Sequence, residues 1–543
     1  MSSTITNASI LVPPTVTPSG TTSVLEEKLS RSSGGKFSML AILLMVAGGL
    51  LYVGTKVRSD LAPVHSTSEF SYFLLGTALV IALGFEFVNG FHDTANAVAT
   101  VIYTHSLNPH VAVIWSGIWN FVGVLASSGA VAFTIIALLP VELILKMNQG
   151  SGFSMVFALL LAAIVWNLVM WYRGLPVSSS HTMIGSVLGV GVAYQLMHGH
   201  SGVNMAEVTK VFKALLFSPL IGFVLAAVLF VVFKAMVRDP RLYKAPEGEE
   251  PPPWHIRALL ILTCTGISFA HGSNDGQKGM GLIMLILVGT VPAAYALNHT
   301  MDADLVAPFA QVSTQVATQL SHYGPPTVTV GESGPALKHF IDTQKVDAST
   351  LPALEQMVAT IRDEAQSYSS LTRVPAEMQA NVRNQMYLVS ETLSMLPKAG
   401  VKLNAADAAL VATYKGYLDR STQYIPTWVK VAVALALGLG TMVGWKRIVI
   451  TVGEKIGKTQ LTYAQGLAAG LTAMATILGA SSLGLPVSTT HVLSSGIAGT
   501  MKASGSGLQK STLRSIAMAW LLTLPAAALL SGLLFVLFSK LAG

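Results

Sequence analysis

Long apolar runs separated by short polar segments recur from residue 37 to the end of the chain. A helix needs roughly 20 predominantly apolar residues to cross the hydrocarbon core of a bilayer. Eleven runs approach or exceed that length, at 37–54, 70–90, 110–139, 153–172, 176–198, 214–237, 255–294, 426–445, 461–483, 486–502 and 511–540. The pattern predicts an all-α integral membrane protein whose first partner is the lipid bilayer.

The composition agrees with this prediction and orients the chain. Hydrophobic residues make up 52% of the sequence and charged residues 11%, whereas soluble domains carry about 25% charged residues. Lys and Arg collect in short cytoplasmic loops. With a cytoplasmic N-terminus, sixteen Lys and Arg residues fall on the cytoplasmic side and six in short segments on the other. We therefore expect a multi-pass plasma membrane protein with an extracytoplasmic C-terminus, and no nucleic-acid partner for the net charge of +7.

The N-terminal segment and the cysteine content exclude several other classes. Residues 1–36 are polar and rich in Ser and Thr, which predicts a disordered tail. The run 37–54 lacks a small-residue cleavage site, so we expect an extra N-terminal span rather than a signal peptide. The single Cys264 excludes a disulfide within the chain and a cysteine-based metal site. We expect no cofactor, no resident metal and no catalytic residue.

Two motifs occur twice in the sequence. FVNGFHDTANA at 87–97 aligns with FAHGSNDGQKG at 269–279, and GLPVSSSH at 174–181 aligns with GLPVSTTH at 484–491. The two offsets, 182 and 310, differ by 128 residues. A polar stretch of about that length lies at 295–424. The sequence therefore contains one repeated unit, and its second copy carries an insertion.

The repeat predicts the domain organisation. The first copy covers 70–237 and the second covers 255–294 together with 426–540. Each copy contains five predicted spanning elements, and because five is odd the second copy must enter the membrane from the opposite side. Inverted-topology repeats with discontinuous helices are typical of secondary transporters, which hold their substrate near the membrane midplane. The insertion at 295–424 is expected to be a mainly helical, extracytoplasmic cap.

The GLPVS motifs combine a proline with hydroxyl groups. Pro176 and Pro486 are suited to the first turn of a helix, where no N–H is needed. Free backbone N–H groups at a helix N-terminus favour anions. The hydroxyls that follow the prolines are Ser178, Ser179, Ser180, Ser488, Thr489 and Thr490. A single such residue is more often an ordinary N-cap, but three hydroxyls in each of two copies indicate a site for an oxyanion.

The other motif places a carboxylate in each copy of the membrane region. A charge at the bilayer centre costs at least ~2.5 kcal/mol, so Asp93 and Asp275 each require a cation. Asn89, Asn96 and Asn274 can supply oxygens, and either site can hold a desolvated alkali cation or a proton. The glycines of 271–281 predict a break in the helix that contains Asp275. The chemistry of His92, His181 and His491 stays open between metal ligation, proton transfer and a structural role.

The motifs NGFHDTANA, HGSNDGQKG and GLPVS with its following hydroxyls resemble those of the inorganic phosphate transporter (Pit) family, and closely those of its bacterial low-affinity members. The resemblance implies symport of inorganic phosphate with H⁺ or Na⁺ in the inner membrane, in bacterial members often as a metal–phosphate complex. It also implies that the six hydroxyls and the two aspartates bind phosphate. The coupling sites that it implies contain Asp93, Asn96, Asn274 and Asp275.

Lys278 departs from the repeat, because Asn96 stands at the equivalent position of the first copy. An ammonium there can replace a sodium ion, so Lys278 joins the predicted coupling group and favours proton coupling. Sodium coupling, another oxyanion such as sulfate, and an intramembrane serine hydrolase remain as alternatives. The hydrolase fits poorly, since Ser and His stand three residues apart in both copies. A homodimer is left open.

Overall fold

The computed structural model describes residues 35–62, 69–138, 151–199, 203, 205–246, 250–298, 303–323, 333–368 and 373–541. Within these residues the regular elements are helices. Eight of these helices are long and apolar enough to cross a membrane, or nine if the bent pair at 405–441 forms one span. The predicted all-α membrane fold is confirmed. The predicted disordered tail lies almost wholly outside the described residues.

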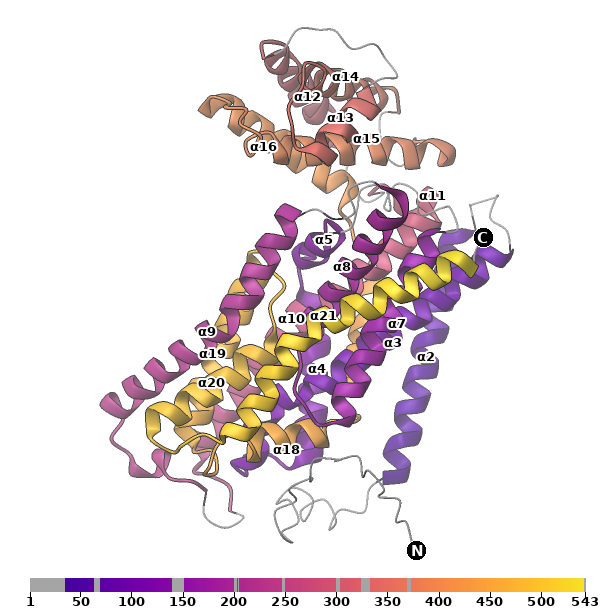
Figure 1. Ribbon diagram of the computed structural model, residues 1–543. Coiled ribbons are helices and arrows are strands. Elements are labelled where there is room, and N and C mark those ends of the chain that lie inside the picture. Colours follow the sequence, from indigo (N-terminus) through magenta and orange to yellow (C-terminus); the bar gives the residue numbers. More distant parts are fainter. Residues whose placement is uncertain are drawn as a thin grey trace, which may run out of the picture.

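The long helices form one bundle, and a smaller helical body lies beyond one end of it (Figure 1). The bundle contains α2 (Gly35–Leu61), α3 (Glu69–Tyr103), α4 (Pro109–Ala126), α5 (Ala130–Ile136), α7 (Ser151–Tyr172), α8 (Ser179–His198), α9 (Met205–Met236), η1 (Pro240–Tyr243), α10 (Trp254–Thr290), α11 (Pro292–Tyr295), α17 (Thr427–Thr441), α18 (Lys446–Glu454), α19 (Tyr463–Ser482), α20 (Thr489–Ser504) and α21 (Lys510–Leu541). The smaller body contains η2 (Ala303–Leu305), α12 (Val306–Ser321), α13 (Ser333–Thr343), α14 (Thr350–Tyr368), α15 (Ala376–Met395) and α16 (Ala405–Thr422), and has an apolar core of its own.

Helix α10 runs without interruption through 271–281, and α3 does the same through 87–97. The predicted helix break at 271–281 is therefore wrong. The glycines serve close packing instead, since a Cβ at Gly272 would overlap the backbone carbonyl of Asn120, and one at Gly276 would overlap Val124. Glycine costs about 1 kcal/mol in a helix interior, and here its small size lets α4 approach α10.

Breaks occur at other positions. The predicted span 110–139 is divided between α4 and α5, and the predicted span 426–445 ends in a turn before α18. Gly129 and Gly444 lie in these two breaks with φ of 91° and 73°. Because these φ values strain any residue with a Cβ, glycine permits the chain to turn there.

The GLPVS motifs form the tips of two helical hairpins, α7–α8 and α19–α20. Their turns are alike, because Gly174 and Gly484 have φ of 66° and 65°. The next residue, Leu175 or Leu485, donates its N–H to a carbonyl five residues earlier. Helices α8 and α20 begin after these turns, with Ser178 and Ser488 as N-caps.

Two predictions fail at these hairpins. Pro176 and Pro486 precede the N-caps by two residues, so they are not in the first turn of a helix. Neither α8 nor α20 is among the candidate spans, so each copy does not provide five spanning elements. The reason is that a hairpin consumes two apolar runs without carrying the chain across.

Two apolar cores show how the hairpins are arranged. The first apolar core contains 75–85 of α3 and 280–287 of α10, and the second contains 95–102 of α3 and 256–270 of α10. Helices α3 and α10 therefore run in opposite directions. Both arms of α7–α8 join the first core and both arms of α19–α20 join the second. The two hairpin tips thus approach each other from opposite ends of the bundle.

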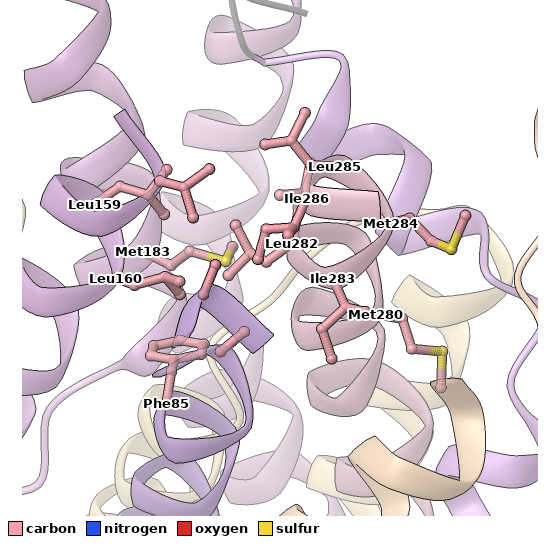
Figure 2. Packing of buried hydrophobic residues seen from close by; sticks show 14 of the residues in the cluster. Phe85, Leu159, Leu160, Met183, Met280, Leu282, Ile283, Met284, Leu285 and Ile286 are labelled. Atoms are coloured by element: carbon pink, nitrogen blue, oxygen red, sulfur yellow. The ribbon is translucent and has the colours of Figure 1, made fainter. Parts of the chain in front are cut away.

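The helices of the two halves have reciprocal packing partners. Helix α9 packs on α20 while α21 packs on α8, and α4 packs on α10 while α17 packs on α3. Figure 2 shows part of the first core, where Phe85 of α3, Leu160 of α7 and Met183 of α8 gather beside Leu282 of α10. Phe85, Met183 and Leu282 adjoin the polar motifs in sequence, so tightly packed apolar groups border the polar centre on this side.

Candidate functional site

Asp93 and Asp275 lie between the two apolar cores, near the middle of α3 and α10. The side chains are buried, with residue exposures of 2% and 0%. An ionised carboxylate in such a place needs hydrogen bonds and positive charge to offset its desolvation. The groups around the two aspartates therefore show what the site is built to bind.

The hairpin tips meet beside these aspartates. Ser180 Oγ of the first tip donates to the carbonyl of Val487 in the second at 2.7 Å. The rings of His181 and His491 lie against each other, with centroids 4.6 Å apart. The N-termini of α8 and α20 thus come together in the buried centre.

Three hydroxyls of the tips reach the carboxylates. Ser179 Oγ donates to Asp93 Oδ2 at 3.0 Å and lies 3.5 Å from Asp275 Oδ2. Thr489 Oγ1 lies 3.5 Å from Asp275 Oδ2, and Thr490 donates its hydroxyl to Asp93 Oδ1. Hydroxyls from both tips therefore converge on both aspartates.

Ser178 and Ser488 have a different task. Ser178 Oγ accepts the backbone N–H of His181 at 3.2 Å, and Ser488 Oγ accepts that of His491 at 3.1 Å. Each is the N-cap of its own helix. The histidine rings do not activate these hydroxyls, because they pack on each other instead, so the arrangement lacks the paired nucleophile and base of a serine hydrolase.

The three predicted asparagines do not form one group. Asn96 Nδ2 donates to Thr490 Oγ1 at 3.0 Å and lies 3.4 Å from Asp93 Oδ1. Asn274 Nδ2 donates to Ser481 Oγ at 2.9 Å and to the carbonyl of Leu485 at 3.1 Å. Asn274 thus holds the turn at the tip of α19–α20, whereas Asn96 reaches Asp93.

Asn89 is likewise directed away from the aspartates. Its Nδ2 lies 3.5 Å from Glu86 Oε2, at the limit of a hydrogen bond. Glu86 is wholly buried on α3 and was not among the predicted site residues. Its position one turn before Asn89 was the signal in the sequence, although the second copy has no acid at the equivalent position.

His271 is a central residue that the sequence analysis did not select. Its Nε2 lies 3.4 Å from Asp275 Oδ2 and 3.7 Å from Asp93 Oδ2. Its Nδ1 lies 2.6 Å from Asn120 Oδ1, so Nδ1 carries the proton that it donates to this oxygen. His271 stands opposite Asn89 in the aligned motifs and one turn before Asp275, which was the available signal.

Asp93, His271 and Asp275 could together hold a metal ion. One ligand atom from each lies within 4.8 Å of the others, and carboxylate with imidazole suits several divalent metals. In the absence of a metal, a proton on Nε2 of His271 gives the same pair of carboxylates a cationic partner. Of the other histidines considered, His92 lies 3.6 Å from Asp93 through Nδ1, while His181 and His491 belong to the tips.

Lys278 supplies the fixed positive charge. Its Nζ lies 2.7 Å from Asp275 Oδ1, and the residue is wholly buried. Asn96 stands three residues after Asp93, and Lys278 stands three residues after Asp275. The ammonium therefore takes up, beside the second aspartate, the place that an amide has beside the first.

Comparisons with known proteins agree with the family that the motifs resemble. A sequence model of the phosphate transporter family matches residues 89–531. The chain is 41% identical over 490 residues to the low-affinity inorganic phosphate transporter PitB of Escherichia coli strain K12, over 86% of this chain and 97% of PitB. It is 42% identical over 492 residues to PitA of the same strain, over 85% and 96% of the two chains.

More distant similarities extend over as much of the chain. A probable low-affinity inorganic phosphate transporter of Bacillus subtilis strain 168 is 29% identical over 471 residues, covering 86% of this chain and 98% of its own. A solved structure described as the sodium-dependent phosphate transporter has a TM-score of 0.48 and 21% identity, over 86% of this chain and 99% of its own.

Proposed function

Because the chain belongs to the phosphate transporter family and is an inorganic phosphate transporter, we propose that it carries phosphate into the cell together with protons. It is a transport protein and not an enzyme. The bacterial relatives support a place in the inner membrane. The distribution of Lys and Arg supports a cytoplasmic N-terminus, with the C-terminus and the insertion at 295–424 on the extracytoplasmic side.

The proposed phosphate site lies between the hairpin tips and the two aspartates. The observation that carries it is the convergence of hydroxyls from two helix N-termini on Asp93 and Asp275. The N–H groups and hydroxyls would bind the phosphate oxygens. Ser179, Thr489 and Thr490 are the side chains best placed for direct contact, while Ser178, Ser180 and Ser488 hold the tips in shape.

The aspartates supply selectivity in this site. At neutral pH phosphate carries at least one O–H group, which can donate to a carboxylate, whereas sulfate carries none. Beside a carboxylate that lacks a donor, sulfate meets only repulsion between like charges. Arsenate has the protonation pattern of phosphate. We expect arsenate to compete with phosphate and sulfate not to.

Charge balance explains why phosphate needs a companion ion. Asp93, Asp275 and Glu86 bring three carboxyl groups to the centre, and Lys278 brings one fixed positive charge. An anion that enters this buried group must be accompanied by positive charge, because unpaired charges at membrane depth are costly. Lys278 beside Asp275 supports protons rather than sodium as that charge, and the triad with His271 supports entry of a metal–phosphate complex as well.

Alternating access follows from the arrangement of the two halves. The antiparallel α3 and α10 and the reciprocal packing of the hairpins support inverted repeats, with copies at 70–237 and at 255–294 plus 426–540. Rocking of one half against the other would expose the shared site to each side in turn.

Reconstitution in proteoliposomes tests this function. Labelled phosphate uptake is measured with an imposed pH gradient in sodium-free medium, and with an imposed sodium gradient at equal pH. Proton-coupled transport requires accumulation in the first case, with inhibition by arsenate. Accumulation under the sodium gradient alone, unaffected when the proton gradient is collapsed, would refute proton coupling.

A further inference from the structure

Several differences between the two copies of the Asp motif change a titratable residue or the size of a side chain. Glu86, Asn96 and Ala97 of the first copy stand opposite Ser268, Lys278 and Gly279 of the second. One copy thus has an additional acid and the other an additional base. In the base-containing copy, the residue after Lys278 has lost its side chain altogether.

The structure brings these three departures together at the contact between α3 and α10. The Glu86 side chain lies directly against Gly279, where any Cβ would overlap its carboxyl group. Lys278 precedes that glycine in the chain, so its charge acts on Glu86 beside this contact. Gly279 leaves room for the Glu86 side chain, and the neighbouring Lys278 supplies a charge opposite to that of an ionised Glu86.

Ser268, which stands at the position equivalent to Glu86, carries no carboxyl group. Ser268 donates its hydroxyl to Cys264 O at 2.8 Å and lies 2.9 Å from Ser116 Oγ. The packing of the repeat therefore does not account for the acid and base at Glu86 and Lys278, because their counterparts are Ser268 and Asn96.

Glu86 has few partners for a buried carboxyl group. Oε2 has the long contact to Asn89, and Oε1 has no hydrogen-bond partner within the described part of the chain. The charged or titratable side chains that act on Glu86 are Lys278, Asp275 and His271, all from α10. Desolvation opposes ionisation of so deeply buried a carboxyl group, and the ammonium of Lys278 offsets part of that cost.

Lys278 is shared between two acids. Its Nζ is 2.7 Å from Asp275, so the single ammonium cannot neutralise both Asp275 and Glu86. One proton resolves the excess charge. Asp275 is engaged by the hydroxyls of the tips, whereas in the described part of the chain no hydrogen bond joins Glu86 to either tip. Glu86 can therefore take up a proton without breaking a hydrogen bond of the phosphate site.

We propose that Glu86 is the carrier of the coupled proton and that Lys278 makes its proton binding depend on the state of Asp275. The proposal rests on proton-coupled phosphate transport as the function. A proton from the outer solution binds the Glu86 carboxylate and forms the carboxylic acid while the site faces outward. After phosphate leaves on the inner side, the same proton dissociates and restores the carboxylate.

Two assays of Glu86→Gln separate this role from phosphate binding. The first is exchange of labelled phosphate across proteoliposomes without an ion gradient, and the second is accumulation driven by a pH gradient. We expect exchange within about twofold of wild type and gradient-driven accumulation reduced at least tenfold. Ser268→Ala, at the equivalent position of the second copy, is the matched control and should leave both assays unchanged.

Glu86→Gln with accumulation equal to wild type would overturn the proposal. So would loss of exchange in a correctly inserted, monodisperse variant, because it would make Glu86 part of the phosphate site. If Glu86→Gln fails to insert, Glu86→Ala, which leaves the pair of Lys278 and Asp275 in place, is measured instead. It must exchange phosphate without responding to the pH gradient, and a response overturns the proposal.

The wild-type protein separates the two ideas. No phosphate exchange in wild type would contradict the function itself. Exchange with sodium-driven but no proton-driven accumulation would contradict proton coupling. If wild type and Glu86→Gln both accumulate phosphate under a pH gradient, only the assignment of Glu86 as proton carrier is contradicted.

Discussion

The ammonium of Lys278 lies 2.7 Å from the carboxylate of Asp275, and Asp275 precedes Lys278 by three residues on the same helix. In the other half of the repeat, the amide of Asn96 lies 3.4 Å from Asp93 at the same spacing. A fixed cation at one acid and an uncharged amide at the other give the two halves different electrostatics around a site that they share. This difference determines several expected results.

Lys278→Asn should make transport respond to sodium. The substitution reproduces the residue of the first copy and leaves Asp275 without its cation, so a sodium ion gains a place. We expect uptake in sodium-free medium to fall at least tenfold and sodium to restore a measurable part of it. Labelled phosphate uptake in sodium and in choline media measures this, and unchanged uptake in choline would contradict the role given to Lys278.

Asp93→Asn and Asp275→Asn should each reduce phosphate uptake at least a hundredfold. The amide keeps the size of the side chain but removes the charge that accepts the hydroxyls and balances the coupled cation. The amount of protein in the membrane, measured by quantitative blotting, shows whether insertion is retained. Near-normal uptake by either variant would remove that aspartate from the site.

Ser179→Ala and Ser178→Ala should have different effects although the residues are adjacent. Ser179 reaches both aspartates, so its loss should raise the KM for phosphate exchange about tenfold. Ser178 is an N-cap, whose loss costs about 1 kcal/mol of stability, so its variant should lower the Tm with a smaller change in KM. If Ser178 and Ser179 both bound phosphate directly, as the repeated motifs predicted, the two variants would have equal KM values. Equal KM values would therefore favour direct phosphate contact by both residues.

The insertion can be tested by replacement. Backbone N–H of Asn298 donates to the carbonyl of Ser421 at 2.8 Å, and its side chain donates to Arg420 O at 2.9 Å. The two ends of the insertion are therefore adjacent, and a short Gly–Ser linker in place of 300–420 can join them without strain. If the insertion is only a cap, exchange stays within a few-fold of wild type, and complete loss in an inserted protein would make it functional.

Glu391, outside the membrane-spanning segments, should make the stability of the insertion depend on pH. Burial raises the pKa of this carboxyl from 4.5 to about 7. Because the folded state holds the proton more tightly than the unfolded chain, this contribution is complete below pH 4.5 and is lost as the pH rises to about 7.

The measurement for Glu391 is amide hydrogen exchange of α15 in the full-length protein, with protection factors corrected for intrinsic rates. Protection should fall between pH 5 and pH 8 in wild type, and Glu391→Gln should flatten the change. Equal pH dependence in both proteins would assign the effect to other groups.

The sequence alone predicted the properties that reside in single segments. Apolar runs predicted membrane helices, because hydropathy depends only on the residues within each run. The two repeated motifs identified Asp93, Asp275 and the hydroxyls, and the family followed from the same residues. The glycines of 271–281 led to the wrong prediction of a helix break, because a glycine is equally suited to a helix break and to close packing of helices.

Only the tertiary structure decided which of these groups meet. Asn274 donates to the turn of α19–α20, Ser178 and Ser488 cap helices, and His271 lies beside both aspartates although its counterpart Asn89 lies beside Glu86. These outcomes depend on how α3, α10 and two hairpins pack across separations of up to several hundred residues. A side chain's type states what it can bind, but its partners are set by the packing of distant helices, which no local pattern of residues encodes.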